Sequence, residues 1–174
     1  FLEGINTILK IWSTEAPYKI KGDYWDVTTE NTLIEDIGQG YMTRPLQRPH
    51  PPIIVTAVAP YSKGVSEAAA RGWKPISADI IMPSWVKTHW EKYIEGCKKG
   101  KLIPSVNDWR IAKTVFVAED LKKAKEYALG PNSPYVFYFK QLFKKFVALG
   151  KLELFKSSMN QPDSEITLEK VCEE

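Results

Sequence analysis

The sequence has only two cysteines and two histidines among its 174 residues, which limits the chemistry it can support. Cys97 and Cys172 stand far apart, with neither a Cys-x-x-Cys motif nor a zinc-binding pattern around them. They are therefore predicted to be free thiols in the reducing cytoplasm, each a small core or surface residue. His50 and His89 have no second ligand at metal-binding spacing, so no metal centre is expected.

Several other signals are missing. The sequence has no apolar run of membrane-spanning length, so no membrane association is expected. Its net charge of +3, from 24 basic and 21 acidic residues, is too small to indicate nucleic-acid binding. There is no Walker A motif, no Gly-x-Gly-x-x-Gly motif and no nucleophile elbow. The chain starts without Met and stops in a helix expected over 166–174, which predicts a piece of a longer protein.

The first third of the chain is expected to contain a helix, a β-hairpin and a long connection. Apolar residues recur every three or four positions over 1–12, which predicts an amphipathic helix. Two short alternating runs in 18–27 flank Gly22-Asp23 and predict a β-hairpin. Residues 28–52 are polar and then proline-rich, and a connection of that length is often functional.

Strand and helix patterns alternate from residue 53 on. Strands are predicted over 53–58, 74–78 and 110–118, with helices over 63–71, 83–99 and 120–129. The run over 53–58 is continuously apolar, as in a strand buried on both faces. Such alternation predicts parallel βαβ units. About three parallel strands are too few for a doubly wound sheet or a closed barrel.

The resulting prediction is an α/β fold, a partial TIM-like (β/α)8 barrel with a hairpin excursion. Residues 1–174 are expected to form one such domain, in three sections. These are the helix, hairpin and Pro-rich excursion (1–52), the βαβαβα core (53–129) and a helical remainder (130–174). The remainder contains a strongly apolar helix over 135–149, whose aromatic stripe predicts a core or subunit interface.

The turn over 59–66 is the best candidate for a ligand site. It leads from the first parallel strand into a helix whose first amides lack intrahelical acceptors and attract anions. Gly64 has no Cβ, so a phosphate can approach the backbone there. Ser62 and Ser66 can add hydroxyls, and Lys63 a positive charge. Spacing alone leaves open whether Ser62 only caps the helix.

Two further polar residues follow. Asp79 comes after the second parallel strand, at the edge where α/β enzymes keep their sites. It is expected either to face a ligand in a substrate pocket or to cap the next helix. His89, beside Trp90 in that helix, is expected at the surface, with a catalytic role as the less favoured alternative.

Four segments of the sequence carry a recognisable pattern: Leu9–Trp12 with Pro17-Tyr18 and Lys21–Val27, then Pro45–Ile53, Ala57–Gly64 and Glu67–Ser77. In this order they resemble the bacterial luciferase-like flavin monooxygenases. Two motifs in these segments are similar to motifs of the alkane or limonene monooxygenase branch of that family. They are Lys-Gly-Asp-Tyr-Trp and Arg-Pro-His-Pro-Pro. The resemblance covers residues 1 to about 118, and the chain corresponds to the C-terminal part of the family's barrel.

The resemblance implies a function. Members of the family bind reduced FMN supplied by a separate flavin reductase and use oxygen to oxidise a small organic substrate. Their loop after the fifth barrel strand holds the flavin phosphate, a role that falls here on Ser62, Lys63, Gly64 and Val65. The chain is therefore expected to be part of a flavin-dependent monooxygenase.

The same resemblance implies what this chain lacks. The family's first strands carry its catalytic histidine, so no catalytic residue is assigned here and the isolated chain is expected to be inactive. Its open sheet edges predict a homo-oligomer or a missing N-terminal segment. Two alternatives remain: a deazaflavin-dependent hydride-transfer enzyme of the same superfamily, and a non-catalytic flavin-binding remnant.

Overall fold

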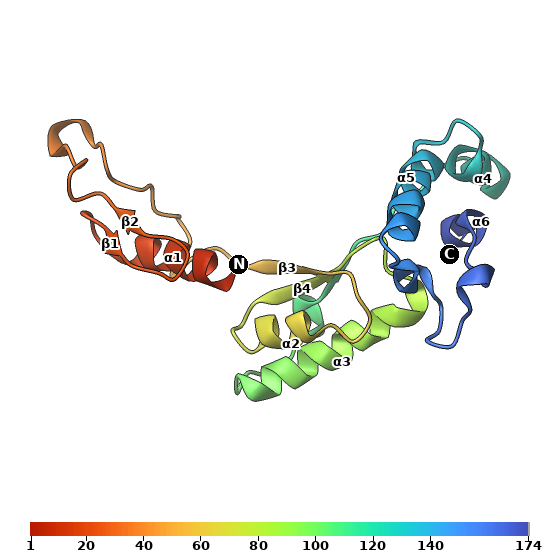
Figure 1. Cartoon of the computed structure of the whole chain (residues 1–174), viewed down its shortest axis with the longest axis horizontal. Helices are drawn as coiled ribbons and strands as arrows, with labels where there is room; N and C mark the ends of the chain where they lie inside the picture. The colour runs from red at the N-terminus through yellow and green to blue at the C-terminus, as the bar shows by residue number, and fades with distance from the viewer. Residues whose placement is uncertain (174) are drawn as a thin grey trace. The chain divides into compact units, whose positions relative to one another are not determined.

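The computed structural model describes residues 1–173 and divides into two compact units, residues 1–52 and the chain from Ile53 on (Figure 1). The boundary falls at the end of the Pro-rich stretch. Eleven helices and strands follow one another in chain order, with four short 3-10 turns between them. The elements are α1 (Leu2–Ser13), β1 (Lys19–Ile20), β2 (Val27–Thr28), β3 (Ile54–Ala57), α2 (Lys63–Ala69), β4 (Lys74–Ser77), α3 (Pro83–Lys99), β5 (Arg110–Ile111), α4 (Leu121–Leu129), α5 (Pro134–Ala148) and, at the end, α6 (Leu168–Glu173).

The first unit pairs an amphipathic helix with a hairpin, as the sequence predicts. β1 and β2 run antiparallel, with Ile20 opposite Val27. The carboxylate of Glu3 in α1 accepts hydrogen bonds from the amides of Asp23, Tyr24 and Trp25, at 2.9–3.3 Å. These contacts fix the hairpin connection against the helix.

The second unit contains the predicted parallel sheet, in the order β3-β4-β5. The register places Ala57 opposite Ser77 and Ser77 opposite Ile111. α2 and α3 lie side by side along one face of the sheet (Figure 1). Between them and the sheet is a small core made of Ala57, Val65, Ala69, Tyr93 and Cys97.

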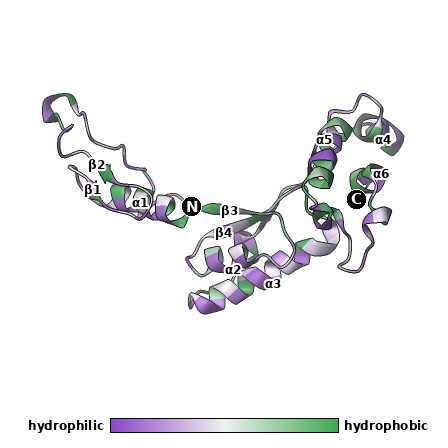
Figure 2. Ribbon diagram, viewed as in Figure 1, coloured by the Kyte–Doolittle hydropathy of each residue, from purple (hydrophilic) through white to green (hydrophobic). Residues whose placement is uncertain are grey.

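A second core joins the start of α3 to α5 and α6. Its buried members come from four elements and the loops between them (Ile81, Met82, Trp85, Phe139, Phe155, Ile166, Val171 and Cys172). The predicted aromatic stripe of α5 supplies Phe139 and, at its margin, Phe143 and Phe146. The hydropathy colouring shows apolar and polar stretches alternating along these helices (Figure 2). Most of the stripe is therefore a core face, as expected, but Phe137, which is 65% exposed, lies outside it.

Two strand predictions are wrong in detail. β3 is not buried on both faces: Ile54 is 41% exposed, because helices cover only one side of the sheet. The third strand ends at Ile111 instead of extending to 118, and Val117 is 86% exposed. β4 ends at Ser77, so beyond Ala112, whose amide donates to the Ser77 carbonyl, the chain leaves its neighbour.

Candidate functional site

The β3–α2 turn lies at the carboxyl end of a parallel strand, where α/β proteins commonly bind ligands. α2 begins at Lys63, so the amides of Lys63 and Gly64 have no acceptor within the helix. A Cβ added to Gly64 would meet only Ser62 Oγ, at 3.5 Å, so the space in front of this backbone is open. The geometry suits an anion approaching the start of α2.

The four predicted residues have different roles in this turn. Ser62 is the N-cap by position, but its side chain makes no capping hydrogen bond, so the simple capping role does not hold. Lys63 and Gly64 are exposed. Val65 is buried in the core, and its amide donates to the Ser62 carbonyl at 3.2 Å. Val65 therefore anchors the turn, while Ser62, Lys63 and Gly64 present groups outward.

Ser66 points elsewhere. Its hydroxyl donates to Glu95 Oε1 and accepts from Lys99 Nζ, each at 3.1 Å. The predicted contribution of this hydroxyl to the anion site is therefore wrong, because it joins α2 to α3.

The turn is held from behind by two consecutive residues of α3. His89 Nε2 lies 2.8 Å from the carbonyl oxygen of Ala59. Thr88 Oγ1 accepts from the amide of Tyr61 at 3.0 Å and donates to the Trp85 carbonyl at 2.6 Å. These contacts fix the backbone on both sides of Pro60.

His89 itself is fully buried, which contradicts the predicted surface position. Its Nδ1 lies 2.8 Å from Ser77 Oγ, and Ser77 Oγ accepts from Trp109 Nε1 at 2.9 Å. Burial lowers the pKa of His89, and the contact with the Ala59 carbonyl opposes this only in part. Burial therefore favours the neutral form of the imidazole within the fold.

A second polar cluster gathers around Asp79, after β4. Asp79 Oδ1 accepts from the amide of Thr114 at 2.9 Å, and Oδ2 from the Thr114 hydroxyl at 2.6 Å. Lys113 Nζ donates to the carbonyl oxygens of Asp79 and Ile81, at 3.2 and 3.1 Å. Burial, followed by the charge of Asp79, raises the pKa of Tyr135.

Asp79 does not cap α3, whose N-cap is Met82 without a side-chain cap. Its carboxylate instead fastens the segment that follows β5 to the end of β4. The two polar clusters thus follow neighbouring parallel strands, β3 and β4.

Sequence reasoning missed His89, Thr88 and Lys113. A signal for His89 exists: Trp85, His89, Tyr93 and Cys97 recur every four residues, and all four are buried. The surface position expected for His89 did not take this repeat into account. No local pattern marks Lys113, because its partners come from a distant part of the chain.

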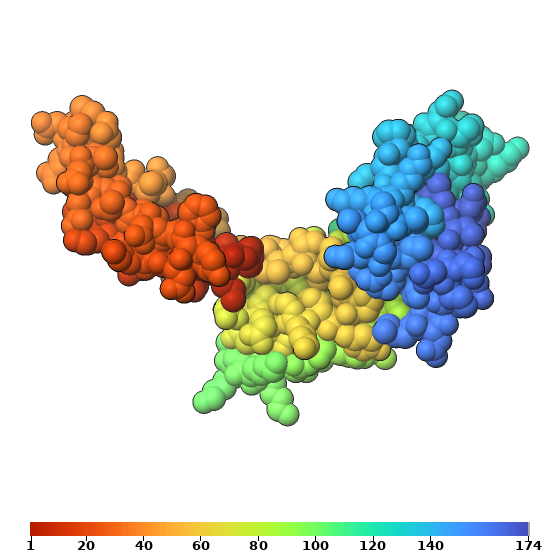
Figure 3. All heavy atoms as spheres, in the orientation of Figure 1, coloured from red at the N-terminus to blue at the C-terminus, as the bar shows by residue number. Residues whose placement is uncertain are grey.

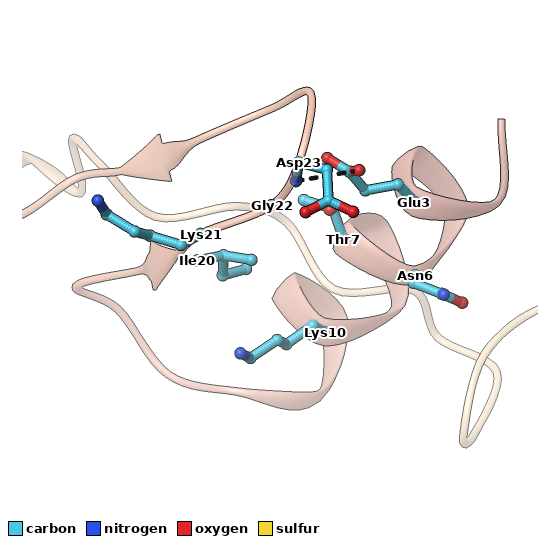
Figure 4. Close-up of a pocket in the computed structure, with 8 residues that line it drawn as sticks. All are labelled: Glu3, Asn6, Thr7, Lys10, Ile20, Lys21, Gly22 and Asp23. Carbon is cyan, nitrogen blue, oxygen red and sulfur yellow. Dashed lines mark hydrogen bonds between the residues drawn. The ribbon is translucent and has the colours of Figure 1, made fainter.

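A hollow of about 470 Å³ lies in the first unit, lined by α1 and the hairpin connection (Figure 4). Glu3 is at its edge, with its carboxylate directed at the backbone of the connection (Figure 4). The amides of Tyr24, Trp25 and Asp23 lower the pKa of Glu3, with that of Tyr24 contributing most. This carboxylate is already hydrogen-bonded to the protein's own backbone. We therefore interpret the hollow as part of the packing between α1 and the hairpin connection.

Among residues 1–173, no cluster of three or more potential metal ligands occurs. None of the helices in this described range is both long and apolar enough to cross a membrane. Cys97 and Cys172 are free and buried, one in each core of the second unit.

No family model matches the chain, and no curated protein does. Solved structures do match. One is the oxygenating constituent of 3,6-diketocamphane monooxygenase from the CAM plasmid of Pseudomonas putida, a type II Baeyer-Villiger monooxygenase in complex with FMN. It is 24% identical, with a TM-score of 0.74 over 99% of this chain and 47% of its own.

A second match is monooxygenase RslO1 from Streptomyces bottropensis, at 20% identity and a TM-score of 0.58. The match covers 87% of this chain and 44% of that one. At these identities the likeness concerns the fold alone. The chain spans about half the length of the monooxygenases whose fold it shares.

Proposed function

We propose that this chain is the C-terminal part of a luciferase-like, flavin-dependent monooxygenase, and that its β3–α2 turn binds the phosphate of FMN. The observation that carries the proposal is the turn itself, with unengaged amides at Lys63 and Gly64 and open space before Gly64. The fold likeness to an FMN-bound monooxygenase supports the choice of ligand.

The residues present fit a phosphate group. Lys63 supplies a positive charge, Ser62 a hydroxyl that does not cap the helix, and Lys63 and Gly64 two amide donors. The positive end of the helix dipole adds to their attraction for a dianion. Val65 contributes by anchoring the turn in the core.

The rest of the proposed active site lies in the remainder of a (β/α)8 barrel, of which this chain supplies the C-terminal part. Reduced FMN, delivered by a separate flavin reductase, supplies the electrons with which oxygen is activated. This chain would hold the flavin phosphate and shape one wall of a pocket for a small organic substrate. The isolated chain is accordingly proposed to have no turnover, because orientation of the reacting groups depends on the missing strands.

We assign Asp79 to that wall, through the backbone it holds. Both carboxylate oxygens are engaged by Thr114, so Asp79 fixes the path of the chain beyond β5. Phe116 on this segment contacts Tyr135 edge to face, with ring centroids 5.6 Å apart. The wall thus combines a fixed backbone with aromatic side chains.

The proposal is tested by comparing FMN with riboflavin, which lacks the phosphate. Calorimetric titration of the 174-residue chain is expected to give at least about tenfold tighter binding of FMN, equivalent to about 1.4 kcal/mol. Gly64→Val places a branched side chain before the two amides and is expected to reduce FMN affinity to that of riboflavin.

Gly4→Val is the matched control, because Gly4 also has open space around its Cβ position but lies in α1. It should leave the preference for FMN intact. Equal affinity for the two flavins, or an unchanged FMN preference in Gly64→Val, would contradict the proposal.

A further inference from the structure

The buried imidazole of His89 lies between the sheet and the turn that holds the proposed phosphate site. Ser77 belongs to β4 and Ala59 to the turn, so this one side chain connects the two. None of its surface is exposed. A buried polar group in this position has no water to replace a lost partner.

The directions of these hydrogen bonds follow from chemistry. The Ala59 carbonyl can only accept, so the proton on the imidazole must be on Nε2. The Trp109 indole can only donate, so Ser77 Oγ accepts from it. The Ser77 hydroxyl proton is then free to be donated to Nδ1. Donation runs in one direction, from Trp109 through Ser77 and His89 to Ala59.

The turn needs such support. Tyr61 has a φ of +51°, a conformation that residues other than glycine rarely adopt. The Ala59 carbonyl is held by His89 on one side of Pro60, and the Tyr61 amide by Thr88 on the other. Together these two tethers oppose relaxation of the turn to a more common backbone conformation.

We infer that His89, as the neutral Nε2–H tautomer, is a positioning residue that presets the β3–α2 turn for anion binding. The inference rests on the proposed function for its ligand, and it deepens that function by naming what orients the site. His89 makes no contact with the anion in this scheme. It acts by fixing Ala59, and through it the direction of the amides at the start of α2.

Substitutions of His89 by the amide side chains Gln and Asn distinguish the two hydrogen bonds of the imidazole. In His89→Gln the side-chain NH₂ can reach the position of Nε2 and restore donation to Ala59. In His89→Asn the shorter side chain can replace only the Nδ1 acceptor facing Ser77. Both variants retain a buried polar group, so a general loss of stability would affect them alike.

Hydrogen exchange is measured first, on the full 174-residue chain without ligand. Amide exchange in residues 59–64 is expected to be close to wild type in His89→Gln and faster in His89→Asn. With FMN as the probe, His89→Gln should bind within about threefold of wild type, and His89→Asn at least about tenfold more weakly.

The tautomer is read from ¹⁵N-histidine NMR. The chain has only two histidines, so a His50→Gln variant assigns the signals. A neutral ring protonated on Nε2 supports the inference, whereas protonation on Nδ1 overturns it. Equal turn exchange in the Gln and Asn variants also overturns it.

Failure of the proposed function gives a different result. If wild type does not prefer FMN but the turn still depends on His89, the phosphate assignment fails and the positioning role is supported. If wild type prefers FMN and both variants bind it equally well, the positioning role fails and the proposed function stands.

Discussion

Glu95 shows how one carboxylate can join two helices. It accepts from Lys92 at 2.6 Å, from Lys99 at 2.8 Å and from the Ser66 hydroxyl at 3.1 Å. The hydrogen bond from Lys92, followed by those from Lys99 and Ser66, lowers the pKa of Glu95 to about 2 from a usual 4.5. Three donors therefore favour its ionised form in the folded chain.

The pH dependence of stability follows from this shift. Because the folded pKa lies below the unfolded one, Glu95 stabilises the fold fully above pH 4.5, and this contribution is lost as pH falls toward about 2. Glu95→Gln is expected to lower the midpoint of urea unfolding at pH 7. As the pH falls from 4.5 toward about 2, this midpoint should decrease less in the variant than in the wild type.

The control for this prediction is Glu91→Gln, which removes an exposed carboxylate from the same helix. It should leave both the midpoint at pH 7 and the acid decline close to wild type. Identical pH profiles for wild type and Glu95→Gln would show that the three contacts do not hold the carboxylate ionised.

The packing of α2 against α3 depends on a close backbone approach. A Cβ added at Gly96 would collide with the Ser66 carbonyl and the Ala69 side chain. Glycine is thus required at this position by the neighbouring helix, even though Gly96 lies in a helix interior, where glycine is unfavourable.

Gly96→Ala is therefore expected to destabilise the second unit by about 1–3 kcal/mol, the usual cost of overpacking. Gly4→Ala, at a helix position with open space, is expected to be neutral or to add up to about 1 kcal/mol through helix propensity. Denaturant unfolding measures both. A stabilising effect of Gly96→Ala would mean that the two helices can separate at no cost.

The elements that the sequence predicted well are those with local signals. α4 begins after Asp120, which accepts from the Lys123 amide, and α5 after Ser133, which accepts from Tyr135 and Val136. The parallel sheet follows from the alternation of strands and helices. Each of these signals lies within a few residues of the feature it predicts.

The features that the sequence did not predict depend on residues far away along the chain. Residues 114–117 are strong strand formers, yet a strand needs a neighbour, and Asp79 takes the Thr114 amide instead. The β3–α2 turn was predicted correctly as a turn at a helix start, but its support by Thr88 and His89 comes from another helix. Local sequence patterns do not contain that information.

At the scale of the whole molecule, the sheet has two open edges. Within residues 1–173, β3 and β5 each pair with β4 alone, so their outer sides carry backbone groups able to pair with another chain. Val115 and Val117, beyond β5, are 75% and 86% exposed. In Figure 3 the atoms of the β3–α2 region, in yellow, form part of the exposed surface of the second unit.

We therefore expect the isolated chain to self-associate, to exchange segments between copies, or to need a companion segment. Light scattering is expected to give a mass above 19.8 kDa. Replacing both Val115 and Val117 with Lys should reduce association, because edge charges oppose strand pairing. A monodisperse 19.8 kDa wild-type species with cooperative unfolding would contradict this expectation.

The two cores of the second unit can be followed separately, because each of them contains one cysteine. Cys97 belongs to the core beneath the sheet, and Cys172 to the core between α3, α5 and α6. Cys97 is 2% exposed and Cys172 is 9% exposed, so opening of its own core is expected to speed the reaction of each sulfur with a thiol reagent. Alkylation followed by mass spectrometry would thus time the opening of the two cores separately, with natural reporters and no substitution.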